Sequence, residues 1–295
     1  MHCRHLVPTL ALVLGVAVSA PPARAAADTV SPPAEGPWTQ ARDASPAFTP
    51  DGSTVVFTRG VGLARRLYMA HRRGDAWSAP VPAPFSDRWM DFEPAMAPDG
   101  SYLVFVSNRP ASGQGKALDG NWGGKPQPGR GGNLWRVDRR GDGWGTPVRL
   151  PDSVNAGTST FSPAVGGDGS LYFVRVNPGN GAFRLYRSRC THDACRPAQP
   201  LALGTGGDRS DYDPAVAPDQ SFIVFSSDRP PAPSNGGDLF IAFAVPGGWS
   251  TPTDLGLAGD EARLGPDRTT LYYSAPDHRI HRVSLAPWLL QRPPR

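Results

Sequence analysis

Two nearly identical stretches of the sequence combine carboxylates with an arginine. The stretches read DFEPAMAPDGSYLVFVSNRP and DYDPAVAPDQSFIVFSSDRP. Each begins with two closely spaced acids and ends near an arginine: Asp91, Glu93 and Arg109 in the first, Asp211, Asp213 and Arg229 in the second. Two carboxyl groups held close together, one with a raised pKa, are the groups with which glycosidases cleave sugar bonds. Carboxylates next to arginines also bind charged ligands, or hold a fold together through charge-assisted hydrogen bonds. These residues therefore admit a catalytic, a binding and a structural interpretation.

The recurrence of these residues favours the structural interpretation for the acids and arginines, because a repeated residue is usually a repeated structural solution. The alternative is a binding mouth in which they act together with Arg88, Trp89 and Trp122. Trp122 lies in an insertion, residues 110–132, that carries charged residues and that no other part of the chain repeats. Repetition therefore does not explain Trp122, and we expect this loop to be an adjustable lid over the mouth.

Other kinds of catalytic site have no counterpart in the sequence. It contains no Gly-x-Ser-x-Gly elbow, no Gly-Lys-Ser/Thr phosphate loop and no His-Glu-x-x-His motif. We predict no cofactor and no catalytic metal. A structural calcium ion could use aspartates of the turns, although such aspartates usually bond to their own backbone.

A column of aspartates shows how the chain is organised. Each follows a Pro or Gly and precedes a run rich in strand-forming residues: Asp51, Asp99, Asp168, Asp219 and Asp267. Each unit also has an aliphatic residue followed by an aromatic residue or its stand-in, and three units have a Trp-x-x-Pro sequence. Four short strands repeated at this spacing are typical of β-propeller blades. The 34 glycines and 34 prolines agree with an all-β chain of many turns.

The two ends of the chain predict how the ring closes. The fifth unit stops near Trp288 without a Trp-x-x-Pro strand, whereas Trp38 precedes the first unit. We therefore expect the N-terminal segment to supply the outer strand of the last blade, which removes open sheet edges. Five blades are predicted. A sixth could lie only in the insertion at 110–132, which lacks strand-forming runs.

The first residues predict export. His2, Arg4 and His5 precede an apolar run, residues 6–20, and small residues follow, as in a secretory signal peptide. The predicted division of the chain is a signal peptide at 1–27, a linker at 28–35, the propeller at 36–290 and a tail at 291–295. No other segment is apolar enough to span a membrane.

The charge of the remaining chain argues against a nucleic-acid partner. Removing residues 1–25 takes away two arginines and no acid, which leaves 28 basic residues against 26 acidic ones. This near balance shows no basic footprint.

Cys190 and Cys195 are the cysteines that remain after the leader. An exported chain meets an oxidising compartment, so we expect them to form a disulfide. The alternative is a metal site that adds His192 and Asp193, for which the spacing supplies suitable geometry only loosely.

The pattern D-[FY]-[DE]-P-A-x-A-P-D, followed by the strand that ends in R-P, resembles the TolB-type, WD-like propeller repeats of bacterial envelope proteins. The resemblance covers residues 36–288 and implies a propeller. Family members act mostly as protein-interaction platforms. The chain departs from TolB itself, since it has no separate N-terminal α/β domain and five units rather than six, so a role in the Tol-Pal system is not carried over.

The sequence therefore predicts an exported, periplasmic or extracellular, five-bladed propeller that acts as a monomer. Its predicted function is non-enzymatic binding of an envelope protein, or of a carbohydrate or peptide, at the mouth of the central channel. The alternative is a glycoside hydrolase that uses Asp91, Glu93, Asp211 and Asp213.

Overall fold

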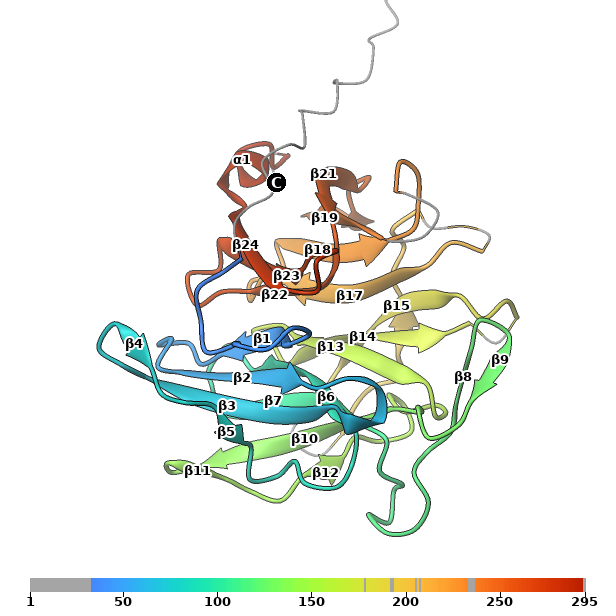
Figure 1. The fold of residues 1–295 in the computed structure, drawn as a ribbon. Coiled ribbons are helices and arrows are strands. Elements are labelled where there is room, and N and C mark those ends of the chain that lie inside the picture. Colours follow the sequence, from blue (N-terminus) through green and yellow to red (C-terminus); the bar gives the residue numbers. More distant parts are fainter. Residues whose placement is uncertain are drawn as a thin grey trace, which may run out of the picture.

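Five antiparallel sheets are arranged around a common centre in the computed structural model (Figure 1). The structure describes residues 33–177, 179–191, 194–204, 206, 208–232 and 237–293. The predicted signal peptide lies outside these residues, as do His192 and Asp193 of the alternative metal site. The prediction of a five-bladed propeller is confirmed.

Each blade has three main strands that pair in chain order. From the first blade to the fifth they are β1 (Ala44–Phe48), β2 (Thr54–Arg59) and β3 (Arg66–Arg73); β6 (Asp91–Met96), β7 (Tyr102–Ser107) and β10 (Asn133–Arg140); β13 (Thr160–Val165), β14 (Ser170–Val176) and β15 (Phe183–Arg189); β17 (Asp211–Val216), β18 (Phe222–Ser227) and β19 (Asp238–Val245); β22 (Asp260–Leu264), β23 (Thr270–Ser274) and β24 (Ile280–Ser284). The first strands contact one another in the order β1, β6, β13, β17, β22 and back to β1, so they line the channel.

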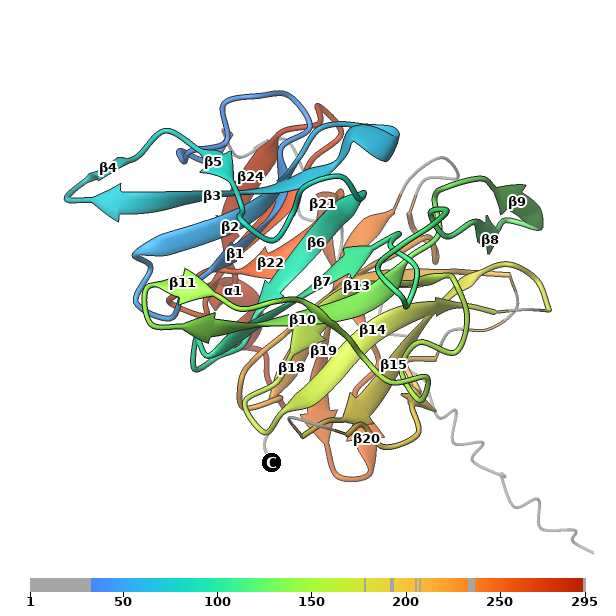
Figure 2. The same ribbon diagram turned by 90° about the horizontal axis from the view of Figure 1, so that it is seen from below.

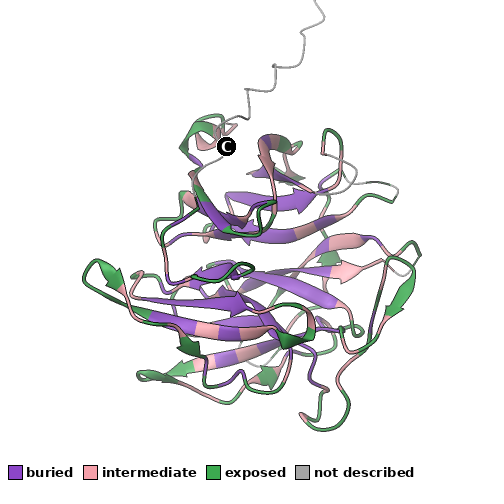
Figure 3. Ribbon diagram, in the orientation of Figure 1, coloured by how far each residue is buried: buried purple, intermediate pink, exposed green. Residues whose placement is uncertain are grey.

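The predicted turn aspartates join the first strand of each blade to the second. Each accepts a hydrogen bond from the backbone N–H two residues later, as Asp99 does from Ser101 at 3.0 Å. The aromatic residues late in the second strands are buried between blades, and Phe57, Phe105, Phe173 and Phe225 are fully buried. The inner strands are accordingly buried and the tips of the blades exposed (Figure 3).

The outer strand is interrupted in most blades. It consists of short pieces: β4 (Ala76–Trp77) and β5 (Val81–Pro82), β11 (Gly143–Trp144) and β12 (Val148–Arg149), β16 (Gln199–Pro200), and β20 (Gly248–Trp249) and β21 (Thr253–Ala258). The break falls at the proline of each Trp-x-x-Pro sequence, because proline has no N–H to donate to a neighbouring strand.

The innermost strands share an irregularity that the sequence did not reveal. In every blade the pairing of the first strand with the second shifts by one residue, which is a β-bulge. The residue directly before the aligned Pro46, Pro94, Pro163, Pro214 or Ala262 has a left-handed backbone, with φ between 49° and 53°. These bulged residues are Ser45, Glu93, Ser162, Asp213 and Glu261. Such φ values are uncommon for residues other than glycine. A bulge changes the direction of a side chain, and here it does so at the same position in all five blades.

The predicted closure by the N-terminal segment is confirmed, although its contact is shorter than a full strand. Pro33 forms a β-bridge with His281, and Ala34 N–H donates to Ile280 O at 2.8 Å. Trp38, expected within this strand, instead packs edge-on between Phe48 of blade one and Tyr272 of blade five. Pro33 and Pro37 lack N–H groups, which limits the ladder that this segment can form.

The insertion at 110–132 contains strands, so the expectation that it lacks them is wrong. β8 (Gly120–Trp122) and β9 (Lys125–Gln127) form a two-stranded hairpin outside the five blade sheets (Figure 1). Gly123 and Gly124 connect the two strands with φ values of 60° and 70°. A Gly-Gly pair fits such a two-residue turn, which requires positive φ at both positions.

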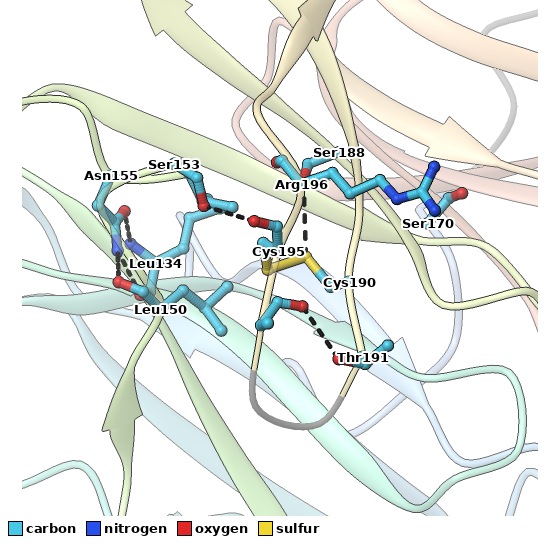
Figure 4. Close-up of a disulfide and its surroundings, with 12 residues drawn as sticks. Leu134, Leu150, Ser153, Asn155, Ser170, Ser188, Cys190, Thr191, Cys195 and Arg196 are labelled. Atoms are coloured by element: carbon cyan, nitrogen blue, oxygen red, sulfur yellow. Dashed lines mark hydrogen bonds between the residues drawn. A yellow bond between two sulfur atoms is a disulfide. The ribbon is translucent and has the colours of Figure 1, made fainter.

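The predicted disulfide between Cys190 and Cys195 is present (Figure 4). It closes the hairpin after β15, in the place where other blades have the first outer piece with its tryptophan. Ser153 Oγ donates to Cys195 O at 2.9 Å and so links this hairpin to the preceding blade. A short α-helix, α1 (Ala286–Leu289), ends the fold, and no helix among the described residues has the length and apolar character needed to cross a membrane.

Candidate functional site

In blades two and four, the acid two residues before the bulged residue forms an ion pair with an arginine of the same blade. Arg109 Nη2 donates to both oxygens of Asp91 at 2.9 and 2.8 Å, and Arg229 pairs with Asp211 in the same way. Asp91 is 0% exposed, and the Arg109 guanidinium also lies over the rings of Phe105 and Trp135. These four predicted site residues therefore hold each blade together, as the structural interpretation expects.

Blade three lacks this ion pair. Thr160 occupies the place that Asp91 has in blade two. The matching arginine, Arg175, donates to the carbonyl oxygens of Ser153 and Val154. The arginine thus keeps its place over the rings of Phe173 and Tyr186 without a carboxylate partner among the described residues.

A cavity of about 500 Å³ opens where the innermost strands begin. All five blades contribute to its wall, which is formed by Arg42, Gly62, Arg65, Met90, Phe92, Glu93, Trp122, Arg130, Phe161, Ser162, Val174, Phe183, Tyr212, Asp213, Asp260 and Glu261. We call this space the mouth cavity. Figure 2 shows the β8–β9 hairpin near the ends of β13 and β14, the strands of the blade that contributes Phe161 and Val174.

Four acids gather in the mouth cavity: Glu93, Asp213, Asp260 and Glu261, here called the acidic cluster. Three of them, Glu93, Asp213 and Glu261, are bulged residues. Ser162, the bulged residue of blade three, connects two of these acids. Its hydroxyl lies 2.5 Å from Asp213 Oδ1 and 3.1 Å from Glu93 Oε2, and its N–H donates to Glu93 Oε2 at 2.6 Å.

Burial and the neighbouring carboxylates raise the pKa values of Glu93, Asp260 and Glu261. Burial, followed by the charges of Asp213 and Glu261, raises the pKa of Glu93 to about 8. Burial raises the pKa of Glu261 as well, while the nearby guanidiniums of Arg65 and Arg263 lower it. Glu93 therefore holds a proton at neutral pH, which removes part of the repulsion within the cluster.

Aromatic rings and arginines form the rest of the wall. Trp122 packs edge-on against Phe161 at 5.4 Å between ring centroids, and Phe183 also packs edge-on against Phe161. Asn121 N–H donates to Ser159 Oγ at 2.9 Å, so the hairpin that carries Trp122 is docked on blade three. Arg65 lies over the Phe92 ring at 5.1 Å.

Arg263 closes the channel beneath the cluster. Its side chain is bonded across the channel, since Nε donates to Pro94 O of blade two at 3.1 Å. On the far side lies a smaller cavity of about 100 Å³, lined by residues at the other ends of the innermost strands. The two mouths differ in size and charge, and the acidic cluster belongs to the wide one.

The structure separates the predicted site residues into three groups. Glu93, Trp122 and Asp213 line the mouth cavity. The two Asp–Arg pairs lie within the blades. Arg88 and Trp89 stack on each other, and Arg88 donates to the insertion at Gly113 O, outside the cavity wall.

Ser162, Asp260 and Glu261 were not among the candidates from the sequence. For Ser162 and Glu261 the alignment held a signal, because each directly precedes the residue aligned with Pro94 and Pro214, as Glu93 and Asp213 do. The residues at this place in the five units could therefore have been recognised as a ring.

The acids of the turns are occupied by their own backbone hydrogen bonds. Among the described residues, no group of three or more His, Cys, Asp or Glu side chains is arranged to hold a metal ion. The acidic cluster differs from the turn acids because its carboxylates line a cavity.

No family model and no curated protein matches the sequence. Similarity appears among solved structures. A putative TolB from Agrobacterium tumefaciens has a TM-score of 0.51 at 16% identity, over 78% of this chain and 69% of that one. A nidogen/laminin complex has a TM-score of 0.51 at 13% identity, over 83% and 76%.

This chain has a TolB-like propeller fold. TolB from Acinetobacter baumannii, at 15% identity and a TM-score of 0.47, aligns over 82% of this chain and 52% of its own. The chain thus spans about half the length of that protein. At these identities the similarity concerns the fold, and the site must be interpreted from its own residues.

Proposed function

We propose that this chain is an exported propeller that binds a protein or peptide at its wide mouth and catalyses no reaction. The observation that carries the proposal is the mouth cavity, whose acids have no arginine hydrogen-bonded to them among the described residues, unlike Asp91 and Asp211. A concave site with a few convergent polar groups and perturbed pKa values is a usual place for ligand binding. The Trp122 hairpin extends this mouth on one side.

Export is supported by the signal-like leader and by the disulfide. A protein partner agrees with the presence of a nidogen/laminin complex among the similar structures. A monomer suffices for this function, because one copy supplies the whole cavity wall.

A photoreactive amino acid placed at position 122 tests the proposal. We expect cross-linking in the exporting cell to a defined partner from position 122, and none from Pro98 at the narrow mouth. The purified partner should then bind the purified protein, and Trp122→Ala should weaken that binding by about tenfold or more, since an interfacial tryptophan commonly contributes over 1 kcal/mol. Cross-links from Pro98 alone would place the binding surface at the narrow mouth and contradict the proposal.

A glycoside hydrolase is the second candidate. It is favoured by Glu93, which has a raised pKa and shares Ser162 with Asp213, because such a pair can supply a general acid and a second carboxylate. A panel of polysaccharides and aryl glycosides decides between the two functions. Hydrolysis that Glu93→Gln abolishes in a folded protein would replace the binding proposal.

A further inference from the structure

The acidic cluster has more hydrogen-bond acceptors than the protein has donors to offer it. Glu93 Oε1, Glu261 Oε1 and both oxygens of Asp260 accept no hydrogen bond from a described residue. Ser162 has a single hydroxyl proton, so it can donate to Asp213 or to Glu93 but not to both. The cluster therefore needs hydrogen-bond donors from outside the chain.

The arginines near the cluster do not supply these donors. Arg263 Nε and Nη1 donate to the carbonyl oxygens of Pro94 and Ala262, and its Nη2 is buried without a partner among the described residues. Arg65 lowers the pKa values of Glu93 and Glu261 through its charge, but donates no side-chain hydrogen bond to a described residue. Both cations moderate the charge of the cluster and leave its oxygens open.

Glu93 offers one of these open acceptors from a side chain that is otherwise well packed. The residue is only 7% exposed, yet it lines the cavity, and its Oε1 accepts no hydrogen bond from a described residue. A ligand in the cavity can therefore donate to this oxygen without moving the side chain.

The aromatic wall identifies what kind of donor fits. Phe92, Trp122, Phe161, Phe183 and Tyr212 surround the approach to the acids. Aromatic faces attract organic cations and bury apolar stems. An ammonium group has three donors and a guanidinium group has five, and neither accepts a hydrogen bond.

Three arginines add a second requirement at the same cavity. The side chains of Arg42, Arg65 and Arg130 donate no hydrogen bond to any described residue. They would repel a ligand that carries only positive charge, and they would attract a carboxylate. A ligand with a cation at one end and a carboxylate at the other satisfies both sets of residues.

We propose that the mouth cavity binds a basic amino acid end, in which an ammonium or guanidinium group on an apolar stem meets the acidic cluster and a carboxylate meets the arginines. This deepens the proposed binding function, on which it rests, by naming the chemistry recognised. A free basic amino acid and the C-terminal residue of a partner protein share this chemistry.

Calorimetric titration of the purified protein with L-arginine and L-citrulline tests the cation. The two molecules have nearly the same shape, but citrulline is neutral. We expect arginine to bind about tenfold or more tightly than citrulline, because only arginine brings a charge to the acids. Agmatine, which lacks the carboxylate, should also bind more weakly than arginine. Equal binding of arginine and citrulline, or none by either, would overturn the proposal.

The peptide Ala-Ala-Arg distinguishes the two sources. Binding as tight as that of arginine, lost when the peptide ends in an amide, indicates the C-terminal residue of a protein. Binding by arginine alone indicates a free amino acid. Either outcome supports the shared chemistry.

Variants locate the site. Glu93→Gln should weaken arginine binding by about tenfold or more, since hydrogen bonds to charged groups are the strong ones. Asp142→Asn, which removes a negative charge at the exposed β10–β11 turn, should leave it unchanged. An unchanged affinity in folded Glu93→Gln would overturn the placement. If Trp122→Ala abolishes partner binding while arginine fails to bind, the proposed function stands and this inference alone fails.

The pH dependence of arginine binding tests the same site in the unmutated protein. The charged groups around Glu93 are Asp213, Glu261, Arg65 and Arg263, and Asp260 lies beside them. Because a bound cation favours ionised Glu93, arginine binding should release a proton near neutral pH and strengthen as the pH rises from 6 to 8. Titrations in buffers of different ionisation enthalpy measure the proton. Glu93→Gln should reduce this release.

Discussion

Asp91 and Glu93 lie two residues apart on β6, and both are buried, yet their surroundings differ. Asp91 accepts two hydrogen bonds from Arg109, whereas no arginine donates to Glu93 among the described residues. Blade four repeats the contrast with Asp211 and Asp213. The acids that pair with an arginine of the same blade stabilise that blade. The acids that have no such arginine line the mouth cavity.

The bulge produces this difference. It changes the direction of the bulged side chain of each innermost strand, so Glu93, Asp213 and Glu261 meet although they come from different blades. Asp91 and Asp211, two residues earlier, stay within the sheet and pair with an arginine of their own blade. We therefore expect the ion pair of Asp91 to stabilise the fold and the buried carboxyl of Glu93 to destabilise it, and unfolding experiments on variants measure both effects.

Arg109→Ala should have the largest effect. It leaves Asp91 buried without a counter-charge, and breaking a buried ion pair costs about 3–5 kcal/mol. Urea unfolding measures the loss. Arg88→Ala, which removes an exposed arginine, is the control and should change stability by about 0.5 kcal/mol or less. A loss below about 1 kcal/mol for Arg109→Ala would contradict the structural role of the pair.

Arg175→Ala should cost less, although Arg175 occupies the equivalent place in blade three. Its partners are carbonyl oxygens, so its removal leaves no buried carboxylate behind, and we expect about 1.5–3 kcal/mol. The same unfolding experiment ranks the two variants. A greater loss for Arg175→Ala would show that the carboxylate contributes little to the ion pair.

Glu93→Gln should change stability in the opposite direction, and by less. The pKa of Glu93 is raised to about 8 in the fold, so the folded protein holds a proton that the unfolded chain releases above about pH 4.5. Folding is therefore penalised increasingly as the pH rises from about 4.5 to 8, and glutamine avoids this penalty. Denaturation at pH 8.5 should show Glu93→Gln to be more stable than the parent protein.

The control for Glu93→Gln is the same measurement at pH 5, where glutamic acid is largely protonated in the fold and the difference between the two proteins should shrink. A variant that is less stable than the parent at both pH values would mean that Glu93 is ionised and well paired in the fold.

Repetition made most of the fold predictable. The aspartate column, the late aromatic residues and the Trp-x-x-Pro sequences recur at set spacings, so five blades, their turns and the ring closure followed from the sequence. The β8–β9 hairpin was missed because its turn is set by Gly123 and Gly124, while its strands are short and poor in strand-forming residues.

The site was predictable only in part. Glu93, Asp213 and Trp122 were among the candidates, but the sequence does not show which acid of a strand meets an arginine and which meets the channel. Which acid faces the cavity depends on the bulge. Nothing in the types of the bulged residues, Ser, Glu or Asp, requires a left-handed backbone. The cluster is therefore a property of the assembled ring.

The contact of Pro33 and Ala34 with β24 joins residues from nearly opposite ends of the described chain. Synthesis produces the first of these partners long before the second, so the ring cannot be sealed until β24 has been made. Contacts between such distant residues are slow to form and leave incomplete species open to aggregation. Until β24 folds, the N-terminal segment therefore lacks the strand edge on which it closes the ring.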